Sequence, residues 1–210
     1  LYKSLSSKEL ILNIKVKVDK INFFLELKNI ENKQNFLWSG DWDNKKIDLS
    51  NYRRYSPSYN SVFQIYKENI HFTKSEEFKL KSNLINRGKK SGRGTNLGEL
   101  NNYFVSLDKL KVSLKKFGYK SQIELNNAQN KNDEIGVVIG KNWELVKLQD
   151  KFGGTHRFAL CKILNINEVT VSVKAIHQAL LDEKDIKMIL NSNNNETIKS
   201  FLQNKIISNI

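Results

Sequence analysis

Alternation of apolar and polar residues predicts two short strands near the start of the chain. Over residues 11–18, Ile14, Val16 and Val18 alternate with lysines, and residues 21–30 continue with the same period. Side chains that repeat at every second residue lie on one face of a strand, so one face of each strand is expected to be buried.

Helical spacing of apolar residues replaces this pattern further along the chain. It predicts helices over residues 61–70 and 76–85. Residues 52–59 hold the only proline and lack a clear period, so an ordered loop is predicted there. The basic, glycine-rich residues 87–98 are predicted to form a second loop, which divides the chain into two parts.

The second part begins with a helix and a hairpin. Apolar positions define a helix over residues 107–117, with Asp108 in its first turn and Gly118 as its stop. Residues 135–139 and 145–148 are predicted to be the two strands of a hairpin.

Further helices and one more strand are predicted toward the end of the chain. Residues 155–164 have an apolar helical face, and residues 169–175 are predicted to be a strand. Beyond Asp182, two helical stretches are separated by a loop at residues 191–195.

The charge of the chain bears on whether it binds nucleic acid. It has 35 Lys and Arg against 22 Asp and Glu, a formal charge of +13, which would favour binding to a phosphate backbone. Lys greatly outnumbers Arg, however, and Lys, Asn and Ile are all abundant, a pattern that an AT-rich coding sequence produces by itself. Nucleic acid is therefore the less favoured partner.

The cysteine count, the histidine spacing and the hydropathy of the chain argue against a disulfide-bonded, a metal-binding or a membrane-spanning protein. Cys161 is the only cysteine, which excludes an internal disulfide and a multi-cysteine zinc site and favours a reducing compartment, so a cytoplasmic location is expected. His71, His156 and His177 show no metal-ligand spacing. No apolar run approaches the roughly 20 residues of a membrane-spanning helix, so no membrane partner is expected. The chain begins at Leu1 rather than Met, which leaves a lost targeting segment open.

The most specific motif is a turn of two glycines followed by a basic pair, Phe152-Gly153-Gly154-Thr155-His156-Arg157. Adjacent glycines let backbone N–H groups approach an anion, and the start of a helix adds partial positive charge. Arg157 can hold a phosphate in bidentate fashion, while His156 and the Thr155 hydroxyl add donors. The alternative is a tight strand-to-helix turn with a solvated arginine.

Residues 104–177 resemble the ParB/sulfiredoxin superfamily in the order of their predicted elements and in this turn. Sulfiredoxins show Phe-Gly-Gly-Cys-His-Arg followed by an aromatic residue and alanines, and Phe158 and Ala159 follow here. A branch of ParB-like proteins with an Asp-Gly-x-His-Arg turn is similar in the surrounding framework, including Gly118-Tyr119 and Gly40-Asp41-Trp42-Asp43. The resemblance implies an α+β fold, a ParB/sulfiredoxin-like mixed sheet with packed helices.

Three regions are expected from this resemblance and from the loop at residues 87–98. Residues 1–98 would form an N-terminal α/β extension packed on the core. Residues 99–180 would form the nucleotide-binding core, and residues 181–210 would add C-terminal helices.

The resemblance also implies a nucleotide site. In this superfamily the glycines and the His-Arg pair contact ATP or CTP phosphates, which would carry over to Gly153, Gly154, His156 and Arg157, with Mg²⁺ neutralising the phosphates. Sulfiredoxins add a hydroxyl from the preceding helix, and Ser113 is the nearest match to it.

Departures from the family patterns bear on the chemistry. Thr155 stands where sulfiredoxins have their catalytic cysteine, and its hydroxyl cannot supply a low-pKa thiolate, so sulfiredoxin activity is disfavoured. Cys161 lies on the apolar side of the helix, as a buried structural thiol would. Gly153 replaces the acidic residue of the second branch, for which Asp150 is the nearest substitute.

Other candidate residues lie outside the turn. Asp41 and Asp43 are two residues apart, so on an extended strand both carboxylates would share a face, where they could bind Mg²⁺ or act as a general base. Ordinary surface acids are the alternative. His177 is a second base or a structural histidine. Basic and aromatic residues that could hold phosphates and stack on a base or sugar are Arg53, Arg54, Arg87 and Arg93 with Tyr52, Tyr55 and Tyr59, and ordinary surface and loop packing is the alternative for them.

The leading functional hypothesis is a nucleotide-binding ParB-like protein that acts as an ATP-dependent phosphotransferase on a small molecule or glycan. The first alternative is a ParB-like DNA-binding protein or nucleotide-dependent switch, although no helix-turn-helix pattern follows the core. The second alternative is an inactive scaffold, because both the catalytic cysteine and the acidic turn residue are missing.

Overall fold

The computed structural model describes residues 12–26, 36–127, 133–149, 153–192 and 194–210. The fold is α+β, with helices packed on a mixed seven-stranded sheet, as predicted. Its strands are β1 (Leu12–Lys17), β2 (Ile21–Leu25), β3 (Leu37–Trp38), β4 (Ile47–Asp48), β5 (Ile135–Ile139), β6 (Leu145–Leu148) and β7 (Glu168–His177).

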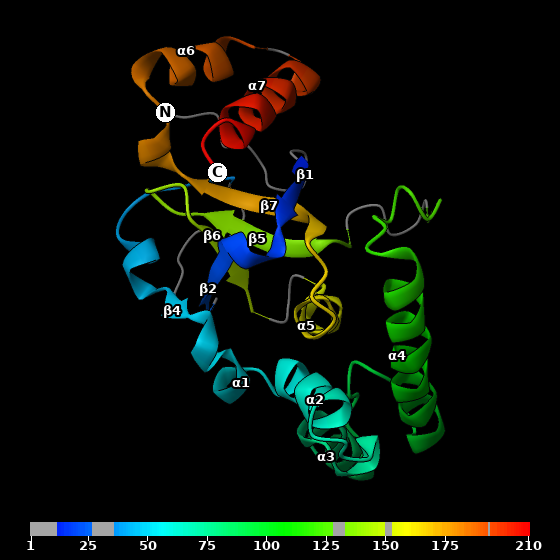
Figure 1. The fold of residues 1–210 in the computed structure, drawn as a ribbon. Helices are drawn as coiled ribbons and strands as arrows, with labels where there is room; N and C mark the ends of the chain where they lie inside the picture. The colour runs from blue at the N-terminus through cyan, green and yellow to red at the C-terminus, as the bar shows by residue number, and fades with distance from the viewer. Residues whose placement is uncertain (1–11, 27–35, 128–132, 150–152, 193) are drawn as a thin grey trace.

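The α-helices are α1 (Tyr52–Tyr55), α2 (Pro57–Tyr66), α3 (Glu76–Asn86), α4 (Leu97–Phe117), α5 (Thr155–Ile163), α6 (Glu183–Asn191) and α7 (Asn195–Ile207). In Figure 1, α6 and α7 lie above the sheet, and α1 to α5 lie below or beside it. Among the described residues, no helix is both long and apolar enough to cross a membrane.

The sheet joins both halves of the chain. Its order is β1-β7-β5-β6-β2-β4, with β3 beside the end of β7. β5 and β6 form the predicted antiparallel hairpin, and β5 runs parallel to β7. Because β1 pairs with β7 and β2 pairs with β6, the residues before 98 supply strands to the central sheet and are not only an extension packed on it.

Residues 52–59 are mostly helical, so the loop predicted there is wrong. Ser56 caps α2, its hydroxyl accepting a hydrogen bond from the Tyr59 backbone N–H at 3.1 Å. Pro57 takes the first position of α2, where a missing N–H removes no helical hydrogen bond. The proline starts a helix here and does not prevent one.

The long helix α4 begins at Leu97, well before the predicted start at residue 107. Asn96 caps it by accepting a hydrogen bond from the Glu99 backbone N–H at 2.9 Å. Asp108 therefore lies inside the helix, where it accepts a hydrogen bond from the Tyr66 hydroxyl at 2.9 Å. Only the end of the helix at Gly118 matches the prediction.

The helix α5 lies between the sheet and the helices α2 and α4. Four successive residues of α5, Phe158, Ala159, Leu160 and Cys161, are fully buried. Burial raises the pKa of the Cys161 thiol to about 12, so the thiol stays protonated at neutral pH. This supports a structural thiol over a nucleophile.

Candidate functional site

The turn before α5 requires glycine at two successive positions. Gly153 and Gly154 have φ values of 78° and 74°, in the left-handed region that residues with a Cβ rarely adopt. A Cβ on Gly154 would lie 2.7 Å from the Cα of Ile135, the first residue of β5, and a Cβ on Gly153 would lie 2.5 Å from Oδ1 of Asp133. The turn is thus held tightly against the amino end of β5.

A cavity of about 290 Å³ lies at this turn. Its lining residues are Arg93, Tyr103, Ser106, Leu107, Leu110, Asp133, Gly153, Gly154, Thr155, His156 and Arg157. One wall is therefore a face of α4, and another is the start of α5. The serine that α4 contributes is Ser106, and the expected Ser113 is exposed elsewhere on the helix. Phe152 and Asp150 lie outside the described residues.

Thr155 brings an unsatisfied polar atom to this cavity. The residue is only 4% exposed, and its Oγ1 is buried without a hydrogen-bond partner in the described part of the chain. An unpaired buried hydroxyl costs about 1–3 kcal/mol unless a ligand or water satisfies it. The first N–H groups of α5 have no partners within the helix, and they carry its partial positive charge. Together these donors suit an anion.

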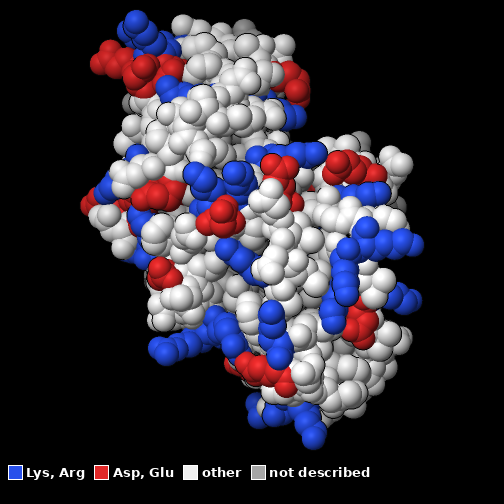
Figure 2. Space-filling view, in the orientation of Figure 1, with Lys and Arg blue, Asp and Glu red and all other residues white. Residues whose placement is uncertain are grey.

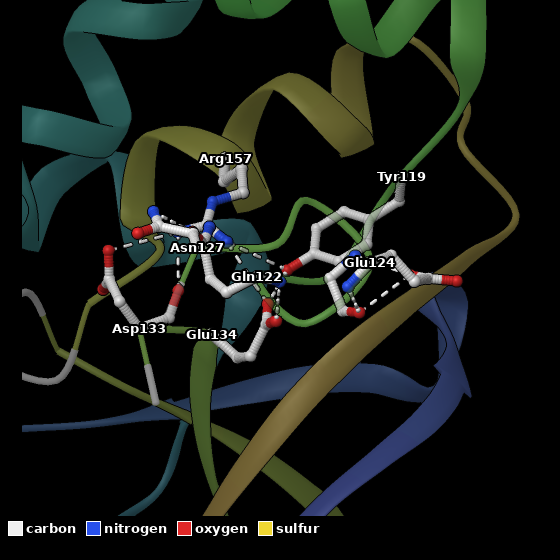
Figure 3. A network of polar contacts seen from close by, with 8 residues as sticks. Tyr119, Gln122, Glu124, Asn127, Asp133, Glu134 and Arg157 are labelled. Atoms are coloured by element: carbon white, nitrogen blue, oxygen red, sulfur yellow. Dashed lines mark hydrogen bonds and ion pairs between the residues drawn. The ribbon is translucent and has the colours of Figure 1, made fainter. Parts of the chain in front are cut away.

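Arg157 is held by acidic residues, which corrects the expectation of a free phosphate clamp. Its Nη1 donates to Oε2 of Glu134 at 3.2 Å, and its Nη2 donates to the backbone oxygen of Asp133 at 2.7 Å and to Oδ2 of the same residue at 3.3 Å. Figure 3 shows the arginine side chain pointing from α5 toward these two residues. Asp133 is half exposed, so a phosphate could replace its carboxylate, whereas Glu134 is fully buried.

Glu134 also connects the segment after α4 to the glycine turn. It accepts hydrogen bonds from the Tyr119 hydroxyl at 2.5 Å and from the Gln122 backbone N–H at 2.6 Å. Figure 3 shows the Tyr119 ring directed at this carboxylate. Burial raises the pKa of Tyr119 above its usual range, and the Glu134 charge adds to the effect, so the hydroxyl remains a donor. Tyr119 and Glu134 together thus position Arg157.

Both ring nitrogens of His156 are already paired within the protein. Nε2 lies 2.6 Å from Oε2 of Glu77, and Nδ1 lies 2.9 Å from the Tyr103 hydroxyl. The expected role of the His156 side chain as a phosphate donor is therefore not supported. Its backbone N–H, in the first turn of α5, is still positioned to contribute to anion binding.

Glu77, near the start of α3, is a buried anion that only the tertiary structure reveals. Its Oε1 accepts hydrogen bonds from the Ser58 hydroxyl at 2.9 Å and from Nε of Arg93 at 3.2 Å. Burial alone would raise the pKa of Glu77, but the hydrogen bond and charge of His156, with Arg93 and Ser58, outweigh burial and lower this pKa to about 2. Glu77 is therefore a carboxylate at neutral pH.

The two aspartates of the Gly-Asp-Trp-Asp segment do not share a face, because the segment is a 3-10 turn and not an extended strand. Asp41 is exposed, whereas Asp43 is fully buried. Oδ2 of Asp43 accepts a hydrogen bond from the Lys141 backbone N–H at 3.1 Å, and its Oδ1 has no hydrogen-bond partner within the described residues. Only Asp43 keeps the features of a candidate site residue.

The structure places Asp43 and the glycine turn at opposite ends of β5. Asp43 contacts Lys141, just after the strand ends, whereas Gly154 contacts Ile135, where the strand begins. A strand of this length spans roughly 15 Å at about 3.3 Å per residue. This separation does not support the expected arrangement, in which Asp41 or Asp43 acts on a nucleotide held by the turn.

His177, at the end of β7, is a structural residue in this geometry. Its Nε2 lies 2.8 Å from the Gly40 backbone oxygen, and its Nδ1 accepts a hydrogen bond from the Ala179 backbone N–H at 3.1 Å. The ring also packs against Trp42, with 5.6 Å between centroids. These contacts hold the 3-10 turn against the sheet and use both ring nitrogens.

Metal ligands are scarce in the part of the chain that the structure describes. No group of three His, Cys, Asp or Glu side chains there is arranged to hold a metal ion. A Mg²⁺ ion accompanying a nucleotide would therefore depend mainly on phosphate oxygens and water, which is a common arrangement for this ion.

Sequence patterns missed Tyr103, Ser106 and Asp133, which line the cavity, and Glu77, which bonds to His156 from outside the lining. Tyr103, Ser106, Leu107 and Leu110 follow the i, i+3, i+4, i+7 spacing of one helical face, but this signal requires a helix that starts before residue 103. Glu77 gives no sequence signal, because its partners come from α2, α5 and the loop before α4.

Comparison of the chain with protein-family models, with curated proteins and with solved structures finds no match.

Proposed function

We propose that the amino end of α5 binds the phosphates of a nucleotide, and that the protein is an ATP- or CTP-dependent phosphotransferase that acts on a small molecule or glycan. The observation that carries this proposal is the buried, unpaired Oγ1 of Thr155 at a cavity formed by two left-handed glycines and a helix amino end. Glycine turns of this kind let several N–H groups converge on one phosphate.

The other residues of the cavity fit an anion with a sugar or base attached. Arg93 and Arg157 add positive charge, and Asp133 moderates it. The volume of about 290 Å³ is near the lower limit of ligand sites, roughly 300 Å³, so the cavity suits the phosphate end of a nucleotide with the base nearer the surface. The similarity of the turn to ParB/sulfiredoxin proteins supports the same ligand class, and the single buried thiol is in keeping with a cytoplasmic location.

Calorimetric titration with ATP, CTP and GTP in the presence of Mg²⁺ tests this proposal, with Thr155→Val as the variant. Valine keeps the shape of threonine but removes the hydroxyl, so the loss of one charge-assisted hydrogen bond should weaken nucleotide binding about tenfold. Stability should stay equal or rise, because the removed hydroxyl is unpaired. Thr197→Val, the same change at an exposed position of α7, is the control and should leave binding unchanged.

The absence of nucleotide binding by the folded wild-type protein would overturn the proposal. Arg157→Ala is a weaker test, because it leaves the fully buried Glu134 without its ion-pair partner and would disturb the fold as well as the cavity.

The alternative of a DNA-binding protein or nucleotide switch is favoured by one observation, the charge of +13. Figure 2 shows, however, that basic side chains are spread over the visible face with acidic side chains between them. A phosphate backbone is bound best by a continuous basic stripe, so this face favours the nucleotide over nucleic acid.

A further inference from the structure

We propose that Tyr103, His156 and Glu77 form a proton relay that deprotonates an alcohol group of the acceptor, with Tyr103 as the catalytic residue that contacts it. The inference rests on the proposed phosphotransferase function and adds the acceptor class and the base. Tyr103 of α4 and His156 of α5 line the cavity of the glycine turn, and Glu77 of α3 bonds to His156 from outside the lining.

Glu77 fixes the protonation of the His156 ring. The carboxylate only accepts hydrogen bonds, so the His156 Nε2 that lies 2.6 Å away must carry a proton. Ser58 and Arg93 hold the other carboxylate oxygen, and the Glu77 backbone N–H donates to the Ser61 hydroxyl at 2.7 Å. Glu77 is therefore a positioning residue that acts through the imidazole.

When the ring is neutral, a proton on Nε2 leaves Nδ1 as an acceptor. The Tyr103 hydroxyl, 2.9 Å from Nδ1, then donates its proton to the ring. The two rings meet edge to face, with 5.6 Å between centroids, and the Arg93 guanidinium lies 4.7 Å from the centre of the Tyr103 ring. Tyr103 and His156 both line the cavity, so this hydrogen-bonded pair lies at its wall.

The proposed step transfers one phosphoryl group and one proton. The acceptor oxygen forms a bond to the terminal phosphorus of the nucleotide, and the bond from that phosphorus to the bridging oxygen breaks, leaving its electron pair on the nucleoside diphosphate. The acceptor proton moves to the Tyr103 oxygen as the Tyr103 proton moves to Nδ1 of His156, and Glu77 stabilises the resulting imidazolium. The products are a phosphate ester and a nucleoside diphosphate.

The cavity wall on α4 indicates what kind of alcohol would fit. Ser106 adds a hydroxyl, and Leu107 and Leu110 add apolar surface beside Tyr103. A small polyol, or the end of a glycan, has both hydroxyl groups and apolar carbon faces to match this wall. The limited volume excludes a large acceptor from entering completely.

Phosphate transfer from ATP and CTP with Mg²⁺, to water and to glycerol or glucose as probe acceptors, tests the relay. Tyr103→Phe should lower turnover about 100-fold or more, the usual contribution of general acid–base catalysis, while the nucleotide Kd changes less than about threefold. His156→Gln should also lower kcat and leave the nucleotide Kd unchanged. Tyr66→Phe is the matched control. It also removes a tyrosine hydroxyl that links two helices, here α2 and Asp108 of α4, but Tyr66 does not line the cavity.

The outcomes separate the two proposals. Nucleotide binding without turnover toward water or either polyol, or wild-type turnover in Tyr103→Phe, would overturn the relay and leave the phosphate site standing. Failure of the wild-type protein to bind any nucleotide would overturn both. An equal loss in Tyr66→Phe would show that the effect is structural, and it would also overturn the relay.

Discussion

At the scale of single residues, three buried side-chain atoms have no hydrogen-bond partner in the described part of the chain. Among the described residues these atoms are Oδ1 of Asn13, Oδ1 of Asp43 and Oγ1 of Thr155. Buried polar atoms are nearly always paired, so each exception needs a reason. For Thr155 the reason offered by the cavity is a ligand, whereas Asp43 lies among turn residues that fix the far end of β5.

Glu77 gives the protein a pH-dependent stability that can be measured. Its pKa of about 2 in the folded protein lies below the usual 4.5, so the ionised form stabilises the fold above about pH 4.5. This contribution, on the order of 3 kcal/mol, is lost as the pH falls toward 2. Glu77→Gln should therefore lower the free energy of unfolding at pH 7, and the difference from the wild type should vanish near pH 2.

Chemical denaturation of both proteins, from roughly pH 2, the folded-state pKa of Glu77, up to about pH 7, provides the measurement. A difference in unfolding free energy that stays constant across this range would mean that the Glu77 carboxylate is not stabilised by its partners.

At the scale of elements, β5 separates two clusters that the sequence suggests as one site. The glycine turn and α5 lie at its first residue, and Asp43 lies just beyond its last. Arg157 pairs with Glu134 beside the glycine turn. At the other end of β5, His177 packs against Trp42 of the 3-10 turn. The rise of a strand, about 3.3 Å per residue, keeps the two clusters roughly 15 Å apart.

Asp43→Asn tests this separation. The amide has nearly the shape of the carboxyl group and keeps an oxygen that can accept the hydrogen bond from the Lys141 N–H, so the fold should persist. Nucleotide binding should remain within about twofold of the wild type, because the residue lies roughly 15 Å from the turn. Calorimetry with ATP and Mg²⁺ provides the measurement, and a tenfold or greater loss of affinity would show that the two ends of β5 act on one ligand.

At the scale of the whole molecule, the question is whether the charge of +13 serves a nucleic-acid partner. Acidic side chains interrupt the basic ones on the face in Figure 2, which would limit the number of phosphates neutralised at once. A protein that contacts several phosphates loses affinity steeply with added salt, because each contact releases counterions.

Salt dependence distinguishes the two ligand classes. Between about 50 and 200 mM salt, any binding to duplex DNA should fall on the order of 100-fold or more, whereas nucleotide binding at the cavity should fall less than about tenfold. Fluorescence anisotropy with labelled DNA and calorimetry with ATP measure the two in the same buffers. DNA binding that resists salt and depends on sequence would favour the DNA-binding alternative.

The sequence by itself determined the elements whose patterns are local. The hairpin strands β5 and β6 have the predicted bounds, β1 alternates as expected, and the glycine turn leads into α5, because period, turn residues and left-handed backbone positions are encoded within a few residues. The starts of α2 and α4, which are set by a capping residue and in α2 also by a proline, were missed because the apolar period is weak there, and the short helix α1 was missed altogether.

Only the tertiary structure decided which of these elements meet. It joined β1 and β2 to the second half of the chain, separated Asp43 from the turn, and brought Glu77, Tyr103 and His156 together from three helices. It also paired Arg157 with Glu134 and Asp133, which no local pattern indicates. The physical reason is that strand pairing and buried ion pairs depend on residues far apart in sequence, whereas helical and strand periods do not.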